Sequence, residues 1–334
     1  MTPSRHPIGV DIEGTKIAAG SVDVSNDSVN NRIEIPTRSE RGGAALFQSV
    51  RDMIVSLVAA PGGMSHGIGV GICEIADGDG KLRCAVTVDW RSRDLNELGG
   101  GGEVVHLVPD VRAAALAEAS FGVARDHKHA LYVSVGTGIA SVPVFEGVPY
   151  GGANGAALVL ATAPRSIVCR HCGSPSQGPL EDIASGRAIA RHHSRGRSGD
   201  AREVLLAAAN GDAAAAELIF RATALLGDAI GRLANCLDPQ AIILGSAAGA
   251  YWDHLQRQLR LLPLIAACIE PFCKPASLSD PSTSKKSRYK RADGRASRAA
   301  CSTGLHHHRG HDPWFLCTQS RCPLGTCAGP DRMM

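Results

Sequence analysis

The sequence lacks a long apolar run, an apolar leader and a high content of aromatic residues. No apolar stretch reaches the roughly 18 residues of a membrane helix, so we expect no membrane partner. The first nine residues carry no apolar core of a secretory signal, so we expect a cytoplasmic protein whose eleven cysteines are free thiols. Only 4% of the residues are aromatic, while Gly and Ala are abundant, which favours closely packed α/β layers with tight turns.

A strong net charge is also absent, because the whole chain carries only +3 at pH 7. Residues 281–334 hold ten Lys and Arg against three Asp and Glu, so the remaining 280 residues carry a net charge of −4. The basic pI therefore comes from the end of the sequence alone, and we expect no nucleic-acid partner.

Apolar periodicity predicts strands that alternate with helices. The first set of elements is expected at residues 7–22, 44–60, 66–75, 104–108 and 111–121. The second set is expected at residues 131–135, 141–145, 183–192, 203–237 (interrupted near residues 210–211) and 241–244. Strand–turn–strand units recur near residues 8–22 and 131–147, which indicates an internal repeat of two related lobes facing a cleft.

Two of the predicted turns between strands carry residues suited to phosphate binding. The first turn runs from Asp11 to Lys16 and could bring backbone N–H groups near a phosphate. Asp11 could also hold a magnesium ion or its waters. The second turn, Gly-Thr-Gly at residues 136–138, allows close approach of an anion. Each turn by itself is equally compatible with an ordinary hairpin.

Two junctions between strands and helices are further candidates. Asp110 follows a predicted strand and begins an alanine-rich helix, where it would act as a base toward an attacking hydroxyl or, alternatively, as a helix N-cap. Near residue 238 a helix ends in a Pro turn, and a buried strand then runs into Gly245 and Ser246. Ligands of α/β folds bind at such strand ends.

These four elements, together with the Gly-Ala-Asn-Gly-Ala-Ala run at residues 152–157, resemble the ROK family (repressors, open reading frames, kinases) over residues 7–275. The resemblance implies an α/β, two-lobed actin-like ATPase (ribonuclease H-like) fold with a ligand cleft between the lobes. It also implies a kinase that uses ATP and Mg²⁺ to phosphorylate a hexose, an amino sugar or a cyclitol. The expected domains are an N-terminal lobe (1–120), a C-terminal lobe (121–275) and a disordered basic tail (276–334).

The resemblance also assigns roles to individual residues. Asp110 would be the general base, and it would bind sugar hydroxyls together with Asn154 and Glu181. The residues implied to bind the nucleotide and its phosphates are Asp11, Gly14, Thr15, Lys16, Gly136, Thr137, Gly138, Gly245 and Ser246.

Several positions depart from the family pattern. Glu13 replaces a glycine, which puts a carboxylate near the triphosphate and disfavours a positive φ there. Pro109 replaces an asparagine whose amide would bind a sugar hydroxyl. Val159 and Thr162 replace the Glu and His that follow the Asn-Gly run. Because valine cannot accept a hydrogen bond, we expect a less hydroxylated or cyclitol-like substrate.

The family's zinc loop is altered as well. Cys169, His171 and Cys172 could supply three ligands, but one family cysteine has become Pro179 and the helper histidine has become Thr162. A structural zinc site takes four ligands, so a polar loop with free thiols is the alternative to bound zinc.

The tail replaces the Gly/Ala-rich helix with which the family normally closes, and its Cys/Arg/Gly/Pro-rich composition resembles a GC-rich gene read in the wrong frame. Three functions stay open: a kinase, a sugar-binding relic without activity, and a sugar-responsive regulator. Regulators of this family carry a winged helix-turn-helix, for which the sequence before Asp11 leaves no room. Asp110 favours a kinase over a relic, whereas the replaced residues favour a relic. Since ROK proteins are often dimers or tetramers, a homo-oligomer is a further expectation.

Overall fold

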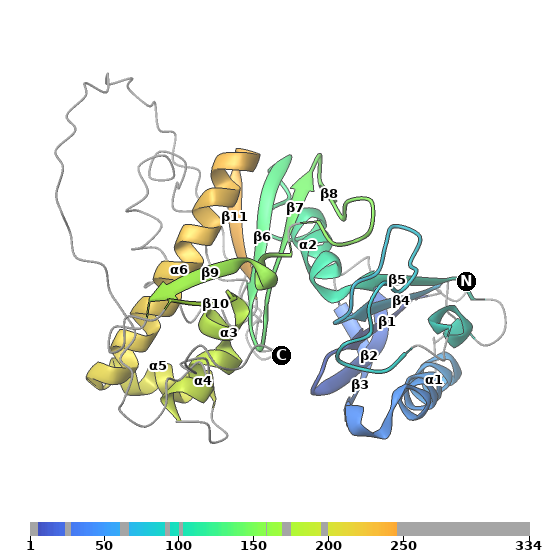
Figure 1. The fold of residues 1–334 in the computed structure, drawn as a ribbon. Coiled ribbons are helices and arrows are strands. Elements are labelled where there is room, and N and C mark those ends of the chain that lie inside the picture. The colour runs from blue at the N-terminus through green and yellow to red at the C-terminus, as the bar shows by residue number, and fades with distance from the viewer. Residues whose placement is uncertain are drawn as a thin grey trace, which may run out of the picture. The chain divides into compact units, whose positions relative to one another are not determined.

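The computed structural model describes residues 6–23, 28–60, 67–90, 94–99, 103–157, 159–168, 175–194 and 200–245. A first sheet has the strand order β3-β2-β1-β4-β5 (Figure 1). Its strands are β1 (Ile8–Ile12), β2 (Lys16–Asp23), β3 (Ser28–Pro36), β4 (Ile68–Ile72) and β5 (Val105–Pro109). β1, β4 and β5 run parallel, and β1, β2 and β3 form an antiparallel meander.

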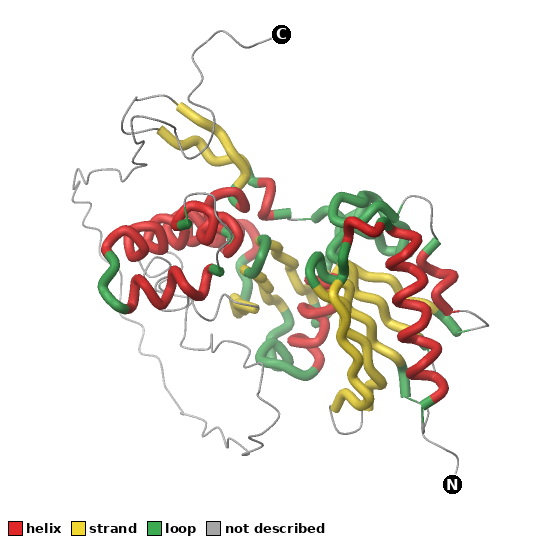
Figure 2. Tube along the Cα trace, turned by 90° about the horizontal axis from the view of Figure 1, so that it is seen from below, coloured by secondary structure: helices red, strands yellow, loops and turns green. Residues whose placement is uncertain are grey.

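Helix α1 (Gly43–Ala59) packs along the first sheet (Figure 2). Its apolar residues recur at helical spacing and form one buried stripe, composed of Leu46, Phe47, Val50, Met53, Ile54 and Leu57. Burial of each such side chain contributes about 1.5–3 kcal/mol relative to exposure. The short 3₁₀ helices η1 (Ser39–Arg41) and η2 (Leu95–Gly99) flank this layer in sequence.

A second sheet has the order β11-β6-β7-β8. Its strands are β6 (His129–Val135), β7 (Ile139–Phe145), β8 (Val148–Pro149) and β11 (Ala241–Gly245). The β6–β7 hairpin has a parallel partner in β11, just as the β1–β2 hairpin has one in β4. The topology thus confirms the internal repeat expected from the two strand–turn–strand units.

Both faces of the second sheet are buried. Helix α2 (Asp110–Ser120) follows β5 and packs on one face, where Ala115 meets Tyr132 and Val142. The other face carries a helical layer made of α3 (Glu181–Ala184), α4 (Gly186–His193), α5 (Ala201–Ala209) and α6 (Ala213–Leu237). The 3₁₀ turn η3 (Leu160–Thr162) packs against this layer through Leu160.

The predicted interruption of the long helix is confirmed. α5 ends before Asn210, Gly211 adopts φ +92°, and the Asp212 carboxylate then accepts hydrogen bonds from the first N–H groups of α6. The single helix expected at 183–192 is wrong, because Ser185 is extended and caps a new helix by accepting a hydrogen bond from Ala188 N–H. Strand β3 was not expected from the sequence.

Strands β9 (Pro164–Val168) and β10 (Pro175–Pro179) form a two-stranded sheet of their own. Residues 165–178 belong to a compact unit separate from residues 1–164 and 179–276. The tail expected at 276–334 lies outside the described residues, and the division into lobes at residue 120 stays a prediction. Within the described part of the chain, no helix has the length and apolarity that a membrane crossing requires.

Candidate active site

Asp11 and Asp110 lie at the carboxyl ends of β1 and β5, the two parallel strands that flank β4. Asp11 pairs in register with Gly71 of β4, which pairs with Val108 of β5, and Asp110 follows two residues later. A Cβ atom at Gly71 would lie 3.5 Å from Asp11 Oδ1 and 3.7 Å from the Cα of Asp110. The absent side chain of Gly71 therefore leaves the space between the two aspartates open.

Asp110 is the first residue of α2, and its carboxylate bonds the start of that helix. The N–H of Val111 donates to Asp110 Oδ1 at 2.6 Å. Pro109 occupies the N-cap position, so the N-cap alternative does not describe Asp110. Burial raises the pKa of Asp110 to about 6, and the charges of Asp11 and Glu13 act in the same direction. A carboxylate with this pKa is suited to accept a proton near neutral pH.

Asp11 is subject to similar forces at the end of β1. Burial by surrounding protein atoms raises its pKa, the charge of Glu13 adds to the rise, and the charge of Lys16 opposes it. Its side chain nevertheless remains accessible to solvent. The ionised form of this carboxylate would therefore gain from a bound cation.

The first predicted phosphate turn connects β1 and β2. Glu13 N–H donates to the carbonyl of Lys16 at 2.9 Å, and the Thr37 hydroxyl donates to the carbonyl of Glu13 at 2.6 Å. Gly14 and Thr15 are exposed at the tip. The positive φ that a side chain at Glu13 disfavours is not required here, because the backbone of Glu13 lies outside the positive-φ region.

The second predicted turn, residues 136–138, connects β6 and β7. Gly136 N–H donates to the carbonyl of Gly138 at 2.9 Å, and Thr137 is exposed at the tip. Ile139 N–H donates to Glu181 Oε2 at 2.8 Å, and a Cβ atom at Gly138 would lie 2.5 Å from the same oxygen. Glu181 therefore lies against this turn, and a side chain at position 138 would displace its carboxylate.

The two expected sugar ligands besides Asp110 lie on different segments. Glu181 begins α3, and its Oε1 lies 4.0 Å from Arg187, which offsets part of its charge. Asn154 is exposed in the turn between Gly151 and Ala157. The carboxylate of Glu181 thus accepts a hydrogen bond from the backbone next to the second turn, and part of the side chain remains accessible to solvent.

The remaining predicted positions lie at the edge of the described residues or beyond it. Gly245 ends β11 and packs against the Tyr132 ring so closely that no Cβ atom would fit. Ser246 lies outside the described residues, as do the candidate zinc ligands Cys169, His171 and Cys172. Among the described residues, no group of three His, Cys, Asp or Glu side chains is placed to hold a metal ion.

Sequence reasoning missed a buried carboxylate, Glu74, which follows β4 and has only 4% of its surface exposed. It accepts hydrogen bonds from three successive backbone N–H groups, those of Val86 (2.8 Å), Thr87 (2.7 Å) and Val88 (3.0 Å). Thr87 in turn bonds the Cys73 thiol and lies beside Gly14. A lone glutamate near the end of the strand predicted at residues 66–75 was the only signal in the sequence.

The carboxylates of this region suit a magnesium ion that arrives with a nucleotide. Asp11, at the end of β1, offers the hard carboxylate oxygens that Mg²⁺ prefers. Mg²⁺ usually takes one or two protein carboxylates and completes its shell with water and phosphate oxygens. A single carboxylate such as that of Asp11 would therefore be enough for a metal ion that shares its shell with a nucleotide.

A family model described as the ROK family matches residues 7–280. A glucokinase from Halalkalibacterium halodurans is 28% identical over 281 residues, which cover 77% of this chain and 84% of that protein. An N-acetyl-D-glucosamine kinase from Aliivibrio fischeri is 27% identical, with 75% of this chain and 88% of that protein covered. The solved structure of a ROK family glucokinase from Streptomyces griseus, in complex with glucose and AMPPNP, has a TM-score of 0.66 at 24% identity, covering 77% and 89% of the two chains.

These similarities agree with the topology, in which each sheet joins an antiparallel hairpin to a parallel partner strand. The expected fold class is confirmed: the protein has the two-lobed actin-like ATPase fold of ROK glucokinases. The family model matches well over half of the 334 residues, and the chain therefore belongs to the ROK family.

Proposed function

We propose that the protein is a kinase that transfers the γ-phosphoryl group of ATP to a hydroxyl of a sugar or sugar-like compound. The observation that carries the proposal is the position of Asp110. This carboxylate lies at a strand end beside Asp11, with a pKa raised to about 6. Its place in a ROK chain related to glucose and N-acetylglucosamine kinases supports the assignment.

In the proposed reaction, Asp110 accepts the proton of the acceptor hydroxyl as that oxygen attacks the γ-phosphorus. The new bond joins the acceptor oxygen to phosphorus, the bond to the β-phosphate oxygen breaks, and ADP leaves. Val111 N–H holds Asp110 Oδ1, which leaves Oδ2 to face the acceptor. General base catalysis of this kind contributes about 10²–10⁴-fold in rate.

The turns at Gly14–Thr15 and Gly136–Gly138 are proposed to bind the phosphates, with Gly245 near the adenosine. Both turns expose their tips and carry glycine where a side chain would block approach. Mg²⁺, held by Asp11, would neutralise charge that develops on the phosphates. Lys16 opposes the pKa rise at Asp11 and would also attract the nucleotide.

The acceptor is proposed to be a hexose, an amino sugar or a cyclitol. Few of its hydroxyls should depend on a hydrogen bond to a carboxylate. Thr162 Oγ1 donates to the carbonyl of Val159 at 3.2 Å, so its hydroxyl already has a backbone partner. Val159 offers no acceptor atom. We therefore expect weaker recognition of glucose than in glucokinases. We also propose that the enzyme works in the cytoplasm, where ATP is available.

The substrate test is release of ADP by the purified full chain with ATP and Mg²⁺ over a panel of hexoses, amino sugars and cyclitols. ADP that depends on one acceptor supports the kinase and names its substrate class. A folded protein that binds a panel member, measured by calorimetry, without releasing ADP would instead be the inactive sugar-binding relic.

The acid limb of the pH profile is a further prediction. As a base, Asp110 must be ionised, and its pKa is raised to about 6. We expect kcat/KM to be flat above this pH and to fall about tenfold for each pH unit below it. Initial rates at saturating ATP and low acceptor concentration, between pH 5 and pH 8, measure the profile. A plateau that continues to pH 5 would exclude Asp110 as the base.

A further inference from the structure

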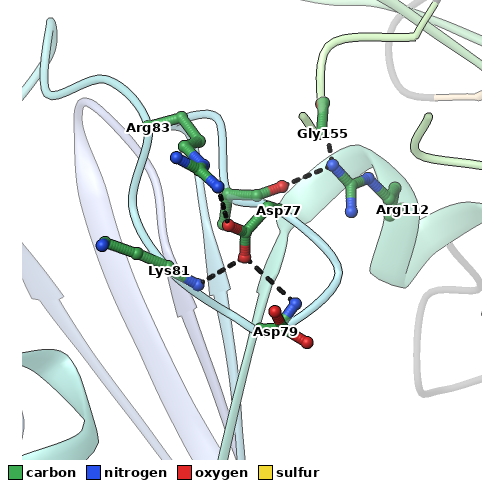
Figure 3. A network of polar contacts seen from close by, with 7 residues as sticks. Asp77, Asp79, Lys81, Arg83, Arg112 and Gly155 are labelled. Atoms are coloured by element: carbon green, nitrogen blue, oxygen red, sulfur yellow. Dashed lines mark hydrogen bonds and ion pairs between the residues drawn. The ribbon is translucent and has the colours of Figure 1, made fainter. Parts of the chain in front are cut away.

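Arg112 lies on α2, two residues after Asp110, and its guanidinium joins two distant segments (Figure 3). Its Nη2 donates to the carbonyl of Ala76 at 2.6 Å and to the carbonyl of Gly155 at 2.8 Å. Ala76 follows β4, whereas Gly155 lies in the Asn-Gly run after β8. One side chain therefore connects the helix of the proposed base to the loop that carries Asn154.

The glycines of that loop make room for the guanidinium. A Cβ atom at Gly151 would lie 2.7 Å from the Arg112 Cζ, and one at Gly155 would lie 2.8 Å from Nη2. Gly155 also adopts φ +76°, which favours glycine. The loop closes through a hydrogen bond from Ala157 N–H to the carbonyl of Gly151 at 3.0 Å. The Gly151–Ala157 loop is thus shaped around Arg112.

The Ala76 side of the contact is rigidly built. Ala76 is fully buried, and the next residue, Asp77, has 5% of its surface exposed. The Asp77 carboxylate accepts hydrogen bonds from Asp79 N–H (3.0 Å) and Lys81 N–H (2.9 Å) and pairs with Arg83 at 2.7 Å (Figure 3). Arg112 therefore holds the loop against a support that is fixed by its own network.

We propose that Arg112 is a positioning residue for the acceptor, which holds the Gly151–Ala157 loop so that Asn154 faces the substrate bound at Asp110. This inference rests on the proposed kinase function. The planar guanidinium suits the task because it can donate to two carbonyls while it lies flat against a glycine. The ammonium of a lysine, as a flexible point charge, would not fix both partners.

The test uses Arg112→Ala and Arg112→Lys in the full chain. Misplacement of a substrate-binding loop by about 1 Å can cost 10²-fold, so we expect the acceptor KM to rise at least tenfold. The KM for ATP and kcat should stay within about threefold, because Arg112 contacts neither the phosphate turns nor Asp110 through its guanidinium. Added guanidinium ions should partly restore the acceptor KM of Arg112→Ala. Arg232→Ala, at an exposed arginine of α6 that lies outside this network, is the control, and its acceptor KM should remain within about threefold.

Hydrogen exchange separates this inference from the proposed function, because it needs no turnover. In Arg112→Ala, the Ala157 amide should exchange at least tenfold faster, while amides of β6 and β7 keep their protection. Unchanged exchange at Ala157 would overturn the positioning role. So would a fall in kcat that is accompanied by equal rises in the KM values for ATP and for the acceptor. If the wild type has no kinase activity but exchange at Ala157 is faster in the variant, the proposed kinase function is contradicted, whereas the contact of Arg112 with the loop is supported.

Discussion

Replacement of Asp110 with asparagine is expected to lower kcat by about 10²–10⁴-fold with little change in ATP affinity. Asparagine keeps the oxygen that accepts the hydrogen bond from Val111 N–H but cannot take a proton from the acceptor. Activity is measured as acceptor-dependent ADP release, and nucleotide affinity by calorimetry in the presence of Mg²⁺. Turnover that persists in this variant would refute the assignment of the base.

The same substitution should not destabilise the fold at pH 8. The pKa of Asp110 is higher in the folded protein, about 6, than its ordinary value of 3.8. Ionisation therefore costs folding stability as pH rises between these values, and the cost is fully present above about pH 6. Asparagine removes that charge, so the midpoint of thermal unfolding should stay or rise. A marked fall in the midpoint would mean that lost activity reflects misfolding.

Replacement of Glu74 with alanine is expected to destabilise the protein by about 2–4 kcal/mol. The carboxylate is buried and bonds three backbone N–H groups of residues 86–88, which no other side chain in this part of the described structure serves. The loss is measured by denaturant unfolding. Glu97→Ala, at an exposed position, is the matched control and should change stability by no more than about 0.5 kcal/mol.

Glu74→Gln separates the shape of this contact from its charge. Glutamine retains one acceptor oxygen, but its amide group faces a backbone donor, so stability should fall by part of the alanine effect. The charge of Glu74 also contributes to the raised pKa of Asp110. The acid limb of the pH profile should therefore move below pH 6 in this variant. An unmoved limb with wild-type stability would show that Glu74 neither supports the loop nor affects Asp110.

The strands that carry the site could be predicted because every second residue is apolar and belongs to the core. The alternation at Ile8, Val10 and Ile12 marks a strand with one buried face, and the parallel register with β4 then places Asp11 beside Gly71. The break at Gly211 was visible because Asn-Gly-Asp combines a helix end with a new N-cap.

Strand β3 could not be predicted, because it is an edge strand whose residues are mostly polar and exposed, such as Asn30, Arg32 and Glu34. It forms through its backbone pairing with β2, and only near its end do apolar residues, Ile33 and Ile35, pack against the core. The same limit applies to single side chains. Glu74, Arg112 and Glu181 each bond segments between 12 and 43 residues away, and no local pattern encodes such partners.

The central claim is that this ROK chain transfers phosphate from ATP to a sugar hydroxyl with Asp110 as the base. The most direct test is mass spectrometry of the acceptors after incubation with the full chain, ATP and Mg²⁺ at pH 8, beside Asp110→Asn. The account predicts an acceptor with one added phosphoryl group that forms with the wild type and not with the variant. A phosphorylated acceptor formed equally by both proteins, or no product from a folded wild type that binds ATP and sugar, would contradict it.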